Sequence, residues 1–280
     1  MQGRVLIVAG SDSGGGAGIQ ADIKTVTALG GYAATAITAL TAQNTQGVFG
    51  IHEVPPEFVA QQMRLVLDDI GADAIKTGML MNAGVIRAVA DVLDDYPDIA
   101  LILDPVMVAK GGAALLESEA IDLLINRLIP RAFLLTPNVP EAEMILNAMG
   151  GGLHLDLAIL NVKDMEEAGG ALLKSGSKAV LMKGGHLEGQ NVTDILVRAR
   201  NPQSATCDTF TSPRIDTRHT HGTGCTLASA IACGIAQKME LEEAVRRARE
   251  YVLEAIKTAL GFGKGHGPLN HGFPFQKPSS

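Results

Sequence analysis

Short, mainly apolar runs alternate with amphipathic stretches along most of this chain. The apolar runs lie at residues 5–9, 74–77, 101–103, 132–136 and 178–183. Stretches with apolar residues at helical spacing lie at residues 19–29, 82–93, 118–128, 139–149 and about 161–174. Apolar runs that do not alternate with polar residues are typical of strands covered on both faces of a parallel sheet. The order of the runs therefore predicts repeated strand-helix-strand units, with helices on both sides of a mostly parallel sheet.

The pattern changes in the last third of the chain. Residues 195–198 and 206–211 are short, more polar runs on either side of an Asn-Pro turn, which predicts an antiparallel edge. Two helices are expected after them, at residues 222–237 and 241–260. The chain has no internal repeat and no segment with the composition of a linker. We therefore expect residues 1–280 to form a single domain, a three-layer αβα sandwich whose mostly parallel central sheet has an antiparallel edge.

Composition argues against several classes of protein. Hydrophobic residues make up 46% and charged residues 19% of the 280, which is typical of a globular chain. The formal net charge of −7 opposes binding to a phosphate backbone, so no nucleic acid partner is expected. No apolar stretch approaches the ~20 residues that span a bilayer, and the short N-terminal run reads as a strand, not as a signal peptide. The three cysteines form no C-x-x-C pair, which argues against disulfides and zinc and fits a soluble, cytoplasmic protein.

A glycine-rich loop follows the first expected strand. Residues 10–18 contain five glycines, and a simple turn needs one or two. Backbone amides in such a loop can approach a ligand closely, and ligands of parallel sheets bind beyond the carboxyl ends of the strands. Gly16, Gly18 and Ala21 match a dinucleotide-binding fingerprint, but the second strand ends without the acidic residue that this fingerprint requires. A Walker loop is absent too, so nucleotide binding must use another segment.

That segment is the sequence His-Gly-Thr-Gly-Cys-Thr at residues 221–226, which opens an apolar helix. Glycines at a helix start free several amides to point at one anion, and the helix dipole adds positive potential there. Cys225 lies where a helix N-terminus would lower the pKa of a thiol, so it is the candidate base for a substrate hydroxyl. The alternative is a small buried side chain, and this is the interpretation for Cys207 and Cys233.

Other polar residues follow the ends of expected strands. Asn138 and Glu141 could orient waters around Mg²⁺, or they could form an N-terminal capping box, and the sequence leaves both open. Lys183 is placed to meet phosphate charge unless it is simply solvated. His219 and His221 form an H-x-H pair without a third ligand, so no structural metal is expected.

Seven motifs in this order resemble those of hydroxymethylpyrimidine/phosphomethylpyrimidine kinases, which have the ribokinase-like fold. The motifs lie at residues 10–22, 41–45, 76–80, 104–107, 136–142, 182–186 and 221–226. The resemblance runs from the first strand to the Gly-Lys-Gly-His-Gly-Pro segment at residues 263–268. It departs from many relatives in the first loop, where Ser13 stands in place of a proline.

The resemblance implies two ATP-dependent phosphorylations in thiamine biosynthesis. The first acts on the alcohol of 4-amino-5-hydroxymethyl-2-methylpyrimidine, the second acts on the resulting monophosphate, and family members are typically homodimers. Gln43 would hydrogen-bond the polar edge of the pyrimidine, and Cys225 would be the base. The remaining implied residues are Gly10, Ala17, Asp22, Met79 and Val106 for the substrate pocket, Gly222, Thr223 and Gly224 for the anion hole, and Asn138, Glu141, Lys183 and Gly184 for ATP and Mg²⁺.

Two alternatives remain from the sequence. Pyridoxal or pyridoxine kinase also phosphorylates a hydroxymethyl group on a flat six-membered ring, but Gly-Thr-Gly-Asp would favour it. Cys225 in place of that aspartate, together with Gln43, favours the pyrimidine. A non-catalytic nucleotide-binding module or an NAD-dependent oxidoreductase is a competitor from another class, and the missing acidic residue after the second strand argues against NAD.

Overall fold

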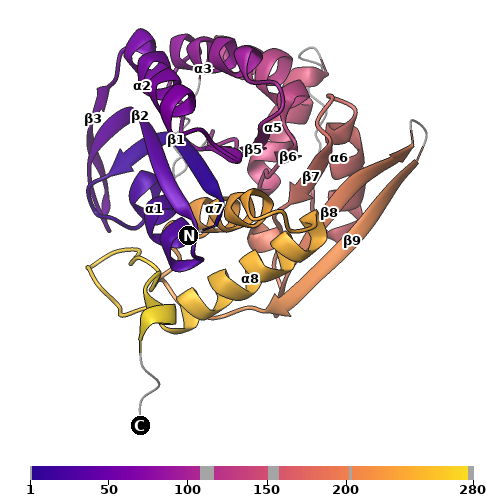
Figure 1. Ribbon diagram of the computed structural model, residues 1–280. Helices are drawn as coiled ribbons and strands as arrows, with labels where there is room; N and C mark the ends of the chain where they lie inside the picture. The colour runs from indigo at the N-terminus through magenta and orange to yellow at the C-terminus, as the bar shows by residue number, and fades with distance from the viewer. Residues whose placement is uncertain (1, 108–116, 151–157, 202–203, 277–280) are drawn as a thin grey trace.

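The computed structural model describes residues 2–107, 117–150, 158–201 and 204–276, which form a layered α/β structure around one sheet (Figure 1). Residues 110–114, a candidate lid loop, and residues 151–156 lie outside these ranges. The sheet has nine strands in the order β3-β2-β1-β4-β5-β6-β7-β8-β9. The strands are β1 Arg4–Asp12, β2 Tyr32–Asn44, β3 Gly47–Glu53, β4 Ala74–Thr77, β5 Ala100–Leu103, β6 Leu134–Leu135, β7 Ala179–Met182, β8 Asn191–Asn201 and β9 Ser204–Pro213.

The centre of the sheet is parallel and both of its edges are antiparallel. Strands β2, β1, β4, β5, β6 and β7 pair in parallel, and β8 and β9 complete one edge as an antiparallel pair. The prediction of an antiparallel edge is therefore confirmed. On the other edge, β3 pairs antiparallel with β2, which the sequence did not predict. Most residues of β3 are exposed, so this strand lacks the buried apolar run that identified the others.

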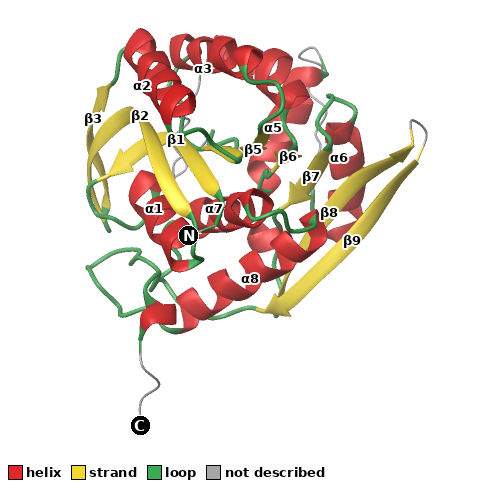
Figure 2. Ribbon diagram, in the orientation of Figure 1, coloured by secondary structure: helices red, strands yellow, loops and turns green. Residues whose placement is uncertain are grey.

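Helices cover both faces of the sheet, as predicted (Figure 2). Helices α2 to α6 pack on one face, and α1, α7 and α8 pack on the other. Within β1, Leu6 and Val8 face the first layer, whereas Val5 and Ile7 face the second, which explains why the run is apolar throughout. The helices are α1 Gly18–Ala28, α2 Pro56–Asp69, α3 Ala83–Asp95, α4 Ser118–Leu123, α5 Val139–Met149, α6 Val162–Leu173, α7 Thr223–Ala236 and α8 Leu241–Lys257.

Two helix predictions differ in detail from the structure. The helix expected at residues 118–128 is α-helical only as far as Leu123 and continues as a π-helical turn, Leu124–Leu128. The last helix ends at Lys257 rather than at residue 260. The chain then turns back, and the backbone N–H of His266 donates to the carbonyl oxygen of Thr45 at 2.8 Å. This contact ties the C-terminal segment to the turn between β2 and β3.

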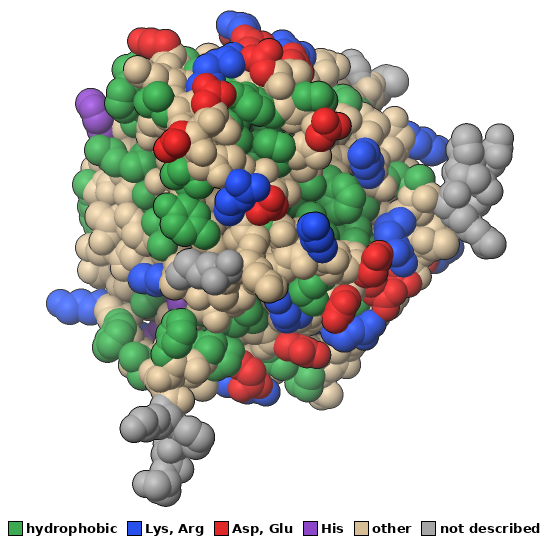
Figure 3. Space-filling model, viewed as in Figure 1, with side chains coloured by type: hydrophobic (Ala, Val, Ile, Leu, Met, Phe, Trp, Pro, Cys, Tyr) green, Lys and Arg blue, Asp and Glu red, His purple; other side chains and the backbone are tan. Residues whose placement is uncertain are grey.

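In the described part of the chain, no helix combines the length and apolar character needed to cross a membrane. On the face drawn in Figure 3, acidic and basic side chains are interspersed rather than gathered by sign.

Candidate active site

Two glycine-rich segments that the sequence places far apart contact each other beside the sheet. Residues 10–18 leave β1 and lead into α1, and residues 221–226 lead into α7. Gly222 precedes α7 with φ +85°, and a Cβ on it would lie 1.9 Å from the carbonyl oxygen of Gly16. Only glycine tolerates both this conformation and this contact. The first turn of α7 therefore begins directly against the glycine loop.

Asp12 holds the glycine loop in its conformation. Its Oδ1 accepts a hydrogen bond from the backbone N–H of Gly14 at 2.8 Å. Its Oδ2 accepts from the backbone N–H groups of Gly16 and Ala17 at 3.1 and 2.8 Å, and it lies 2.9 Å from His221 Nε2. Burial alone would raise the pKa of Asp12, but the hydrogen bonds from His221 and the backbone amides lower it below its usual value. Sequence reasoning gave Asp12 no role, although an aspartate before glycines is a known turn signal.

Lys183 reaches the start of α7 from the end of β7. Its Nζ lies 2.7 Å from Asp104 Oδ1 and 3.8 Å from Glu141 Oε2, and its side chain is only 11% exposed. A Cβ on Gly224 would lie 3.4 Å from this Nζ, so the ammonium group lies next to the first turn of α7. Burial alone would lower the pKa of Lys183, but Asp104 and Glu141 raise it above its usual value. Lys183 is therefore charged, and it is not the solvated lysine of the alternative interpretation.

Asn138 and Glu141 form the capping box that the sequence allowed. Asn138 Oδ1 accepts from the backbone N–H of Glu141 at 2.9 Å, and Glu141 Oε2 accepts from the backbone N–H of Asn138 at 2.8 Å. Burial raises the pKa of Glu141 to about 7, against the opposing effect of Lys183, and the nearby charge of Asp104 adds to the rise. Two carboxylates thus share one ammonium group. The ammonium group of Lys183 neutralises only one of the two carboxylates, so a further cation would balance the charge of the cluster.

A second buried ion pair lies on the α7 side of the sheet. Lys76 Nζ lies 2.8 Å from Asp22 Oδ2, and both side chains are fully buried. Ser229 Oγ of α7 donates to Asp22 Oδ1 at 2.7 Å. Burial alone would lower the pKa of Lys76, but Asp22 and the charges of Cys225 and Asp104 raise it above its usual value. The carboxylate of Asp22 is therefore fully engaged inside the protein, where the sequence had predicted a residue that shapes the substrate pocket.

Cys225 occupies the first turn of α7, as expected, but its pKa is raised rather than lowered. Burial raises the pKa of the Cys225 thiol to about 11, although the charge of Lys76 and a backbone hydrogen bond from Gly18 act to lower it. The net shift is therefore upward, opposite to the lowering that the helix N-terminus alone predicts. Loss of hydration and the charges of Asp22 and Asp104 outweigh the favourable contacts.

The predicted substrate residues Gly10, Met79 and Gln43 have distinct contacts. Met79 packs over Gly10, because a Cβ on Gly10 would come 2.4 Å from Met79 Cε. Gln43, near the end of β2, lies within hydrogen-bond distance of Thr41 at 3.1 Å and of His221 at 3.2 Å. The structure therefore joins Gln43 to the segment that leads into α7, a link that no sequence signal indicated.

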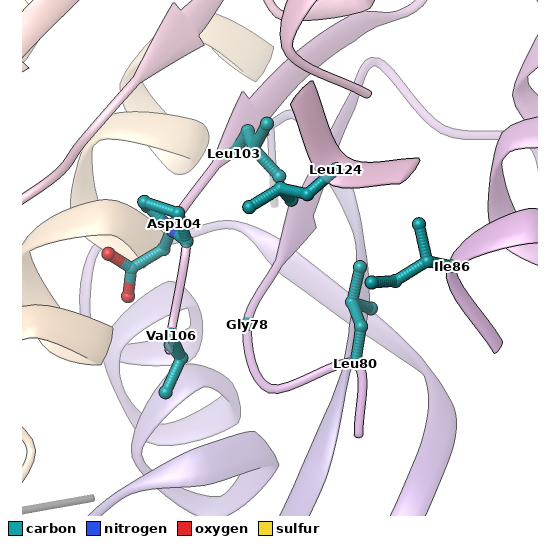
Figure 4. Close-up of a pocket in the computed structure, with 8 residues that line it drawn as sticks. Gly78, Leu80, Ile86, Leu103, Asp104, Val106 and Leu124 are labelled. Carbon is teal, nitrogen blue, oxygen red and sulfur yellow. The ribbon is translucent and has the colours of Figure 1, made fainter. Parts of the chain in front are cut away.

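Val106 belongs to a different part of the site. It follows β5, which β4 and β1 separate from β2, and it lines a small, mainly apolar pocket (Figure 4). The Asp104 carboxylate points away from Leu124 and Ile86 in this view, toward α7. The pocket is lined by Gly78, Leu80, Ile86, Leu103, Asp104, Pro105, Val106 and Leu124.

Known proteins match this chain over nearly its whole length. The family model described as phosphomethylpyrimidine kinase matches residues 12–270. A hydroxymethylpyrimidine/phosphomethylpyrimidine kinase of Bacillus subtilis is 45% identical over 99% of this chain and 97% of its own length. A thiamine biosynthesis bifunctional protein of Geobacter sulfurreducens is 51% identical over 96% of this chain, which spans 52% of that longer protein.

A solved structure gives the same fold. Bacillus subtilis pyridoxal kinase, in a complex with ADP, has a TM-score of 0.85 and 32% identity, and the match covers 97% of this chain and 98% of that one. The predicted ribokinase-like fold is therefore confirmed. From the family match, the identities and the shared motifs, we conclude that this chain belongs to the phosphomethylpyrimidine kinase family.

Proposed function

We propose that this protein phosphorylates 4-amino-5-hydroxymethyl-2-methylpyrimidine, and then its monophosphate, with ATP as the phosphoryl donor in thiamine biosynthesis. The family match and the identities of 51% and 45% support this assignment. One feature of the site carries the chemistry. The first turn of α7 lies beside both the glycine loop and the ammonium group of Lys183.

Residues 222–225 form the proposed anion hole. The first backbone N–H groups of a helix have no partner inside it, so those of Gly224 and Cys225 can point at a phosphoryl group. The N–H of Thr223 lies 3.5 Å from the carbonyl oxygen of Thr220 and would have to leave it to join them. Gly224 has no side chain, which lets Lys183 approach the same position. Phosphoryl transfer depends mainly on positioning and on neutralising charge, and these groups supply both.

Lys183, Gly184, Asn138 and Glu141 are the proposed ATP and magnesium residues. The cluster fits a further cation because Asp104 and Glu141 share one ammonium group and the pKa of Glu141 is raised to about 7. In the described residues, no group of three or more His, Cys, Asp or Glu side chains could hold a metal ion. Mg²⁺ usually keeps waters and phosphate oxygens as ligands, and Glu141 would orient such a water. When bound with ATP, Mg²⁺ neutralises phosphate charge.

Gln43 is the proposed recognition residue for the pyrimidine, and Gly10, Ala17, Met79 and Val106 are the other proposed residues of the substrate pocket. Asp22 would affect this pocket only indirectly, because its carboxylate is hydrogen-bonded to Lys76 and Ser229.

Replacing Gln43 with alanine is expected to raise KM for the pyrimidine about tenfold while kcat stays within a few-fold, since a neutral hydrogen bond to a ligand is worth about 1 kcal/mol or more. Steady-state kinetics of the purified variant measure this. Gln46→Ala, an exposed glutamine in the adjacent turn, is the matched control. An unchanged KM in Gln43→Ala would count against the role of Gln43.

ADP release with four acceptors tests the assignment as a whole. The acceptors are the hydroxymethylpyrimidine, its monophosphate, pyridoxal and ribose. We expect the highest kcat/KM with the two pyrimidines. Pyridoxal as the best acceptor would favour the alternative function, phosphorylation of pyridoxal. The similar fold of Bacillus subtilis pyridoxal kinase supports that alternative. Turnover with none of the four would leave a non-catalytic nucleotide-binding module.

A homodimer that covers the β3 edge is the proposed assembly. Val48, Phe49 and Ile51 of β3 are 44%, 72% and 42% exposed, and an uncovered apolar edge strand invites pairing with another chain. Phe49→Asp should convert the dimer to a monomer in sedimentation velocity at micromolar concentration. Phe275→Asp changes a phenylalanine that is 69% exposed elsewhere and should stay dimeric. A Phe49→Asp protein with the sedimentation coefficient of the wild type would contradict this interface.

Residues 1–280 are proposed to act as one kinase domain in the cytoplasm. The continuous nine-stranded sheet supports the first part, because its strands run from Arg4 of β1 to Pro213 of β9. The three free cysteines are compatible with a reducing compartment.

A further inference from the structure

His221 joins the glycine loop to the proposed substrate residue Gln43. Its Nε2 lies 2.9 Å from Asp12 Oδ2 and 3.2 Å from the side-chain amide of Gln43. The side chain of His221 is 15% exposed and that of Asp12 is 4% exposed. Its backbone N–H donates to the carbonyl oxygen of Gly267 at 3.2 Å, so the C-terminal segment holds the residue in place. The ring is therefore fixed between two polar groups.

The hydrogen bonds that Asp12 accepts determine which ring nitrogen of His221 carries a hydrogen. The carboxylate already accepts three backbone N–H groups, from Gly14, Gly16 and Ala17, which stabilise its charged form. A ring nitrogen 2.9 Å from an ionised carboxylate oxygen must carry a hydrogen, because two acceptors would repel. Nε2 of His221 is therefore a donor, toward both Asp12 and Gln43.

The same reasoning fixes the amide of Gln43. The oxygen and nitrogen ends of an amide have the same shape, so hydrogen-bond partners decide their placement. As placed, Gln43 Nε2 lies 3.2 Å from His221 Nε2, and Gln43 Oε1 lies 3.1 Å from Thr41 Oγ1. A half-turn of the amide exchanges the two ends, and the end that faces His221 must then be the oxygen, since it meets an N–H donor. The end 3.1 Å from Thr41 Oγ1 must be the nitrogen, because the Thr41 hydroxyl donates to the carbonyl oxygen of Ser11 at 2.8 Å and has only lone pairs left. His221 and Thr41 therefore require the same orientation of the Gln43 amide.

We propose that His221, held by Asp12, is a positioning residue that locks the Gln43 amide and so sets the order of donor and acceptor shown to the substrate. In the locked amide, one N–H and one oxygen lone pair remain for a ligand. A 4-aminopyrimidine offers the complementary pair, a ring nitrogen that accepts beside an amino group that donates. A 4-oxo analogue reverses that order. This inference rests on the proposed function, because it concerns recognition of the same pyrimidine.

Binding of the two analogues to wild type and to His221→Phe tests the lock. Titration calorimetry with the hydroxymethylpyrimidine and its 4-oxo analogue gives their two dissociation constants. The wild type should prefer the 4-amino compound about tenfold or more, because the reversed ligand leaves buried groups unpaired. In His221→Phe only the Thr41 contact still orients the amide, so the preference should fall by about threefold or more. General loosening of the pocket would weaken both ligands and keep their ratio.

Two further variants separate positioning from folding. His221→Gln places an N–H donor at a similar distance from the backbone and should restore most of the preference. In a Gln43→Ala background, His221→Phe should leave the ratio unchanged, since no amide remains to be oriented. A His221→Phe protein that unfolds at the wild-type temperature but keeps the full preference would overturn the inference alone. A wild type that binds neither pyrimidine would overturn both the inference and the proposed function.

Discussion

Replacing Cys225 with alanine is expected to lower kcat by about 10²-fold or more, while binding of the pyrimidine stays measurable. The loss follows from the position of the thiol in the first turn of α7, between the anion hole and the charge of Lys76. Alanine keeps the backbone amides that hold the phosphoryl group, so only the proton acceptor is removed. ADP release at saturating substrate measures kcat, and calorimetry measures the binding.

The pH dependence of kcat gives a second measurement on the same variant. The pKa of the Cys225 thiol is raised to about 11, so the thiolate is the minor form at neutral pH and its fraction grows as pH rises. A thiolate base therefore makes kcat of the wild type increase between about pH 7 and 9. Cys225→Ala should lack this increase.

Cys207→Ala is the matched control, because Cys207 is exposed on β9. The interpretation of Cys207 as a small buried side chain is therefore wrong, whereas Cys233 is buried. The kcat of Cys207→Ala should equal that of the wild type. Activity of Cys225→Ala within a few-fold of the wild type would exclude Cys225 as the base, and catalysis would then depend on the anion hole and Lys183 alone.

Lys76→Met is expected to lower the free energy of unfolding by about 3–5 kcal/mol. The substitution leaves the carboxylate of Asp22 fully buried with Ser229 as its remaining hydrogen-bond donor. A buried charge that has lost its partner is costly because the protein interior replaces neither water nor the counter-ion. Urea unfolding followed by circular dichroism gives the change.

The double variant Lys76→Met with Asp22→Asn tests the cause. The neutral amide can still accept from Ser229, so the double variant should be more stable than Lys76→Met alone. Lys178→Met, at an exposed lysine just before β7, should change stability by no more than about 0.5 kcal/mol. A double variant as unstable as the single one would show that the unpaired charge is not the cause.

The layered fold follows from the chain's pattern of apolar residues. Runs such as residues 5–9 need cover on both faces, and only a parallel sheet between helices gives that cover to several of them at once. Strand β3 was not predicted, because it has no buried apolar run of this kind. Its side chains are mostly exposed, so pairing with β2, and not burial, makes it a strand.

The candidate site was predictable only where one short segment carries the whole signal. The glycines of residues 221–226 and the capping box of Asn138 and Glu141 are local features, and the structure contains both. The ion-pair partner of Lys76 could not be predicted from the local sequence, because Asp22 lies 54 residues away along the chain. A lysine inside an otherwise apolar strand was the available signal that a buried partner exists.

The sequence by itself determined most of the order of strands and helices, except β3 and α2, together with the two glycine segments and the family of this protein. The tertiary structure alone decided the charge of each buried group, since a pKa depends on which residues surround it. Cys225 is the clearest case. Its position in the helix predicts a lowered pKa, but burial and the carboxylates of Asp22 and Asp104 raise it. Hydration and Coulomb energies depend on distances in space, and separation along the chain does not specify those distances.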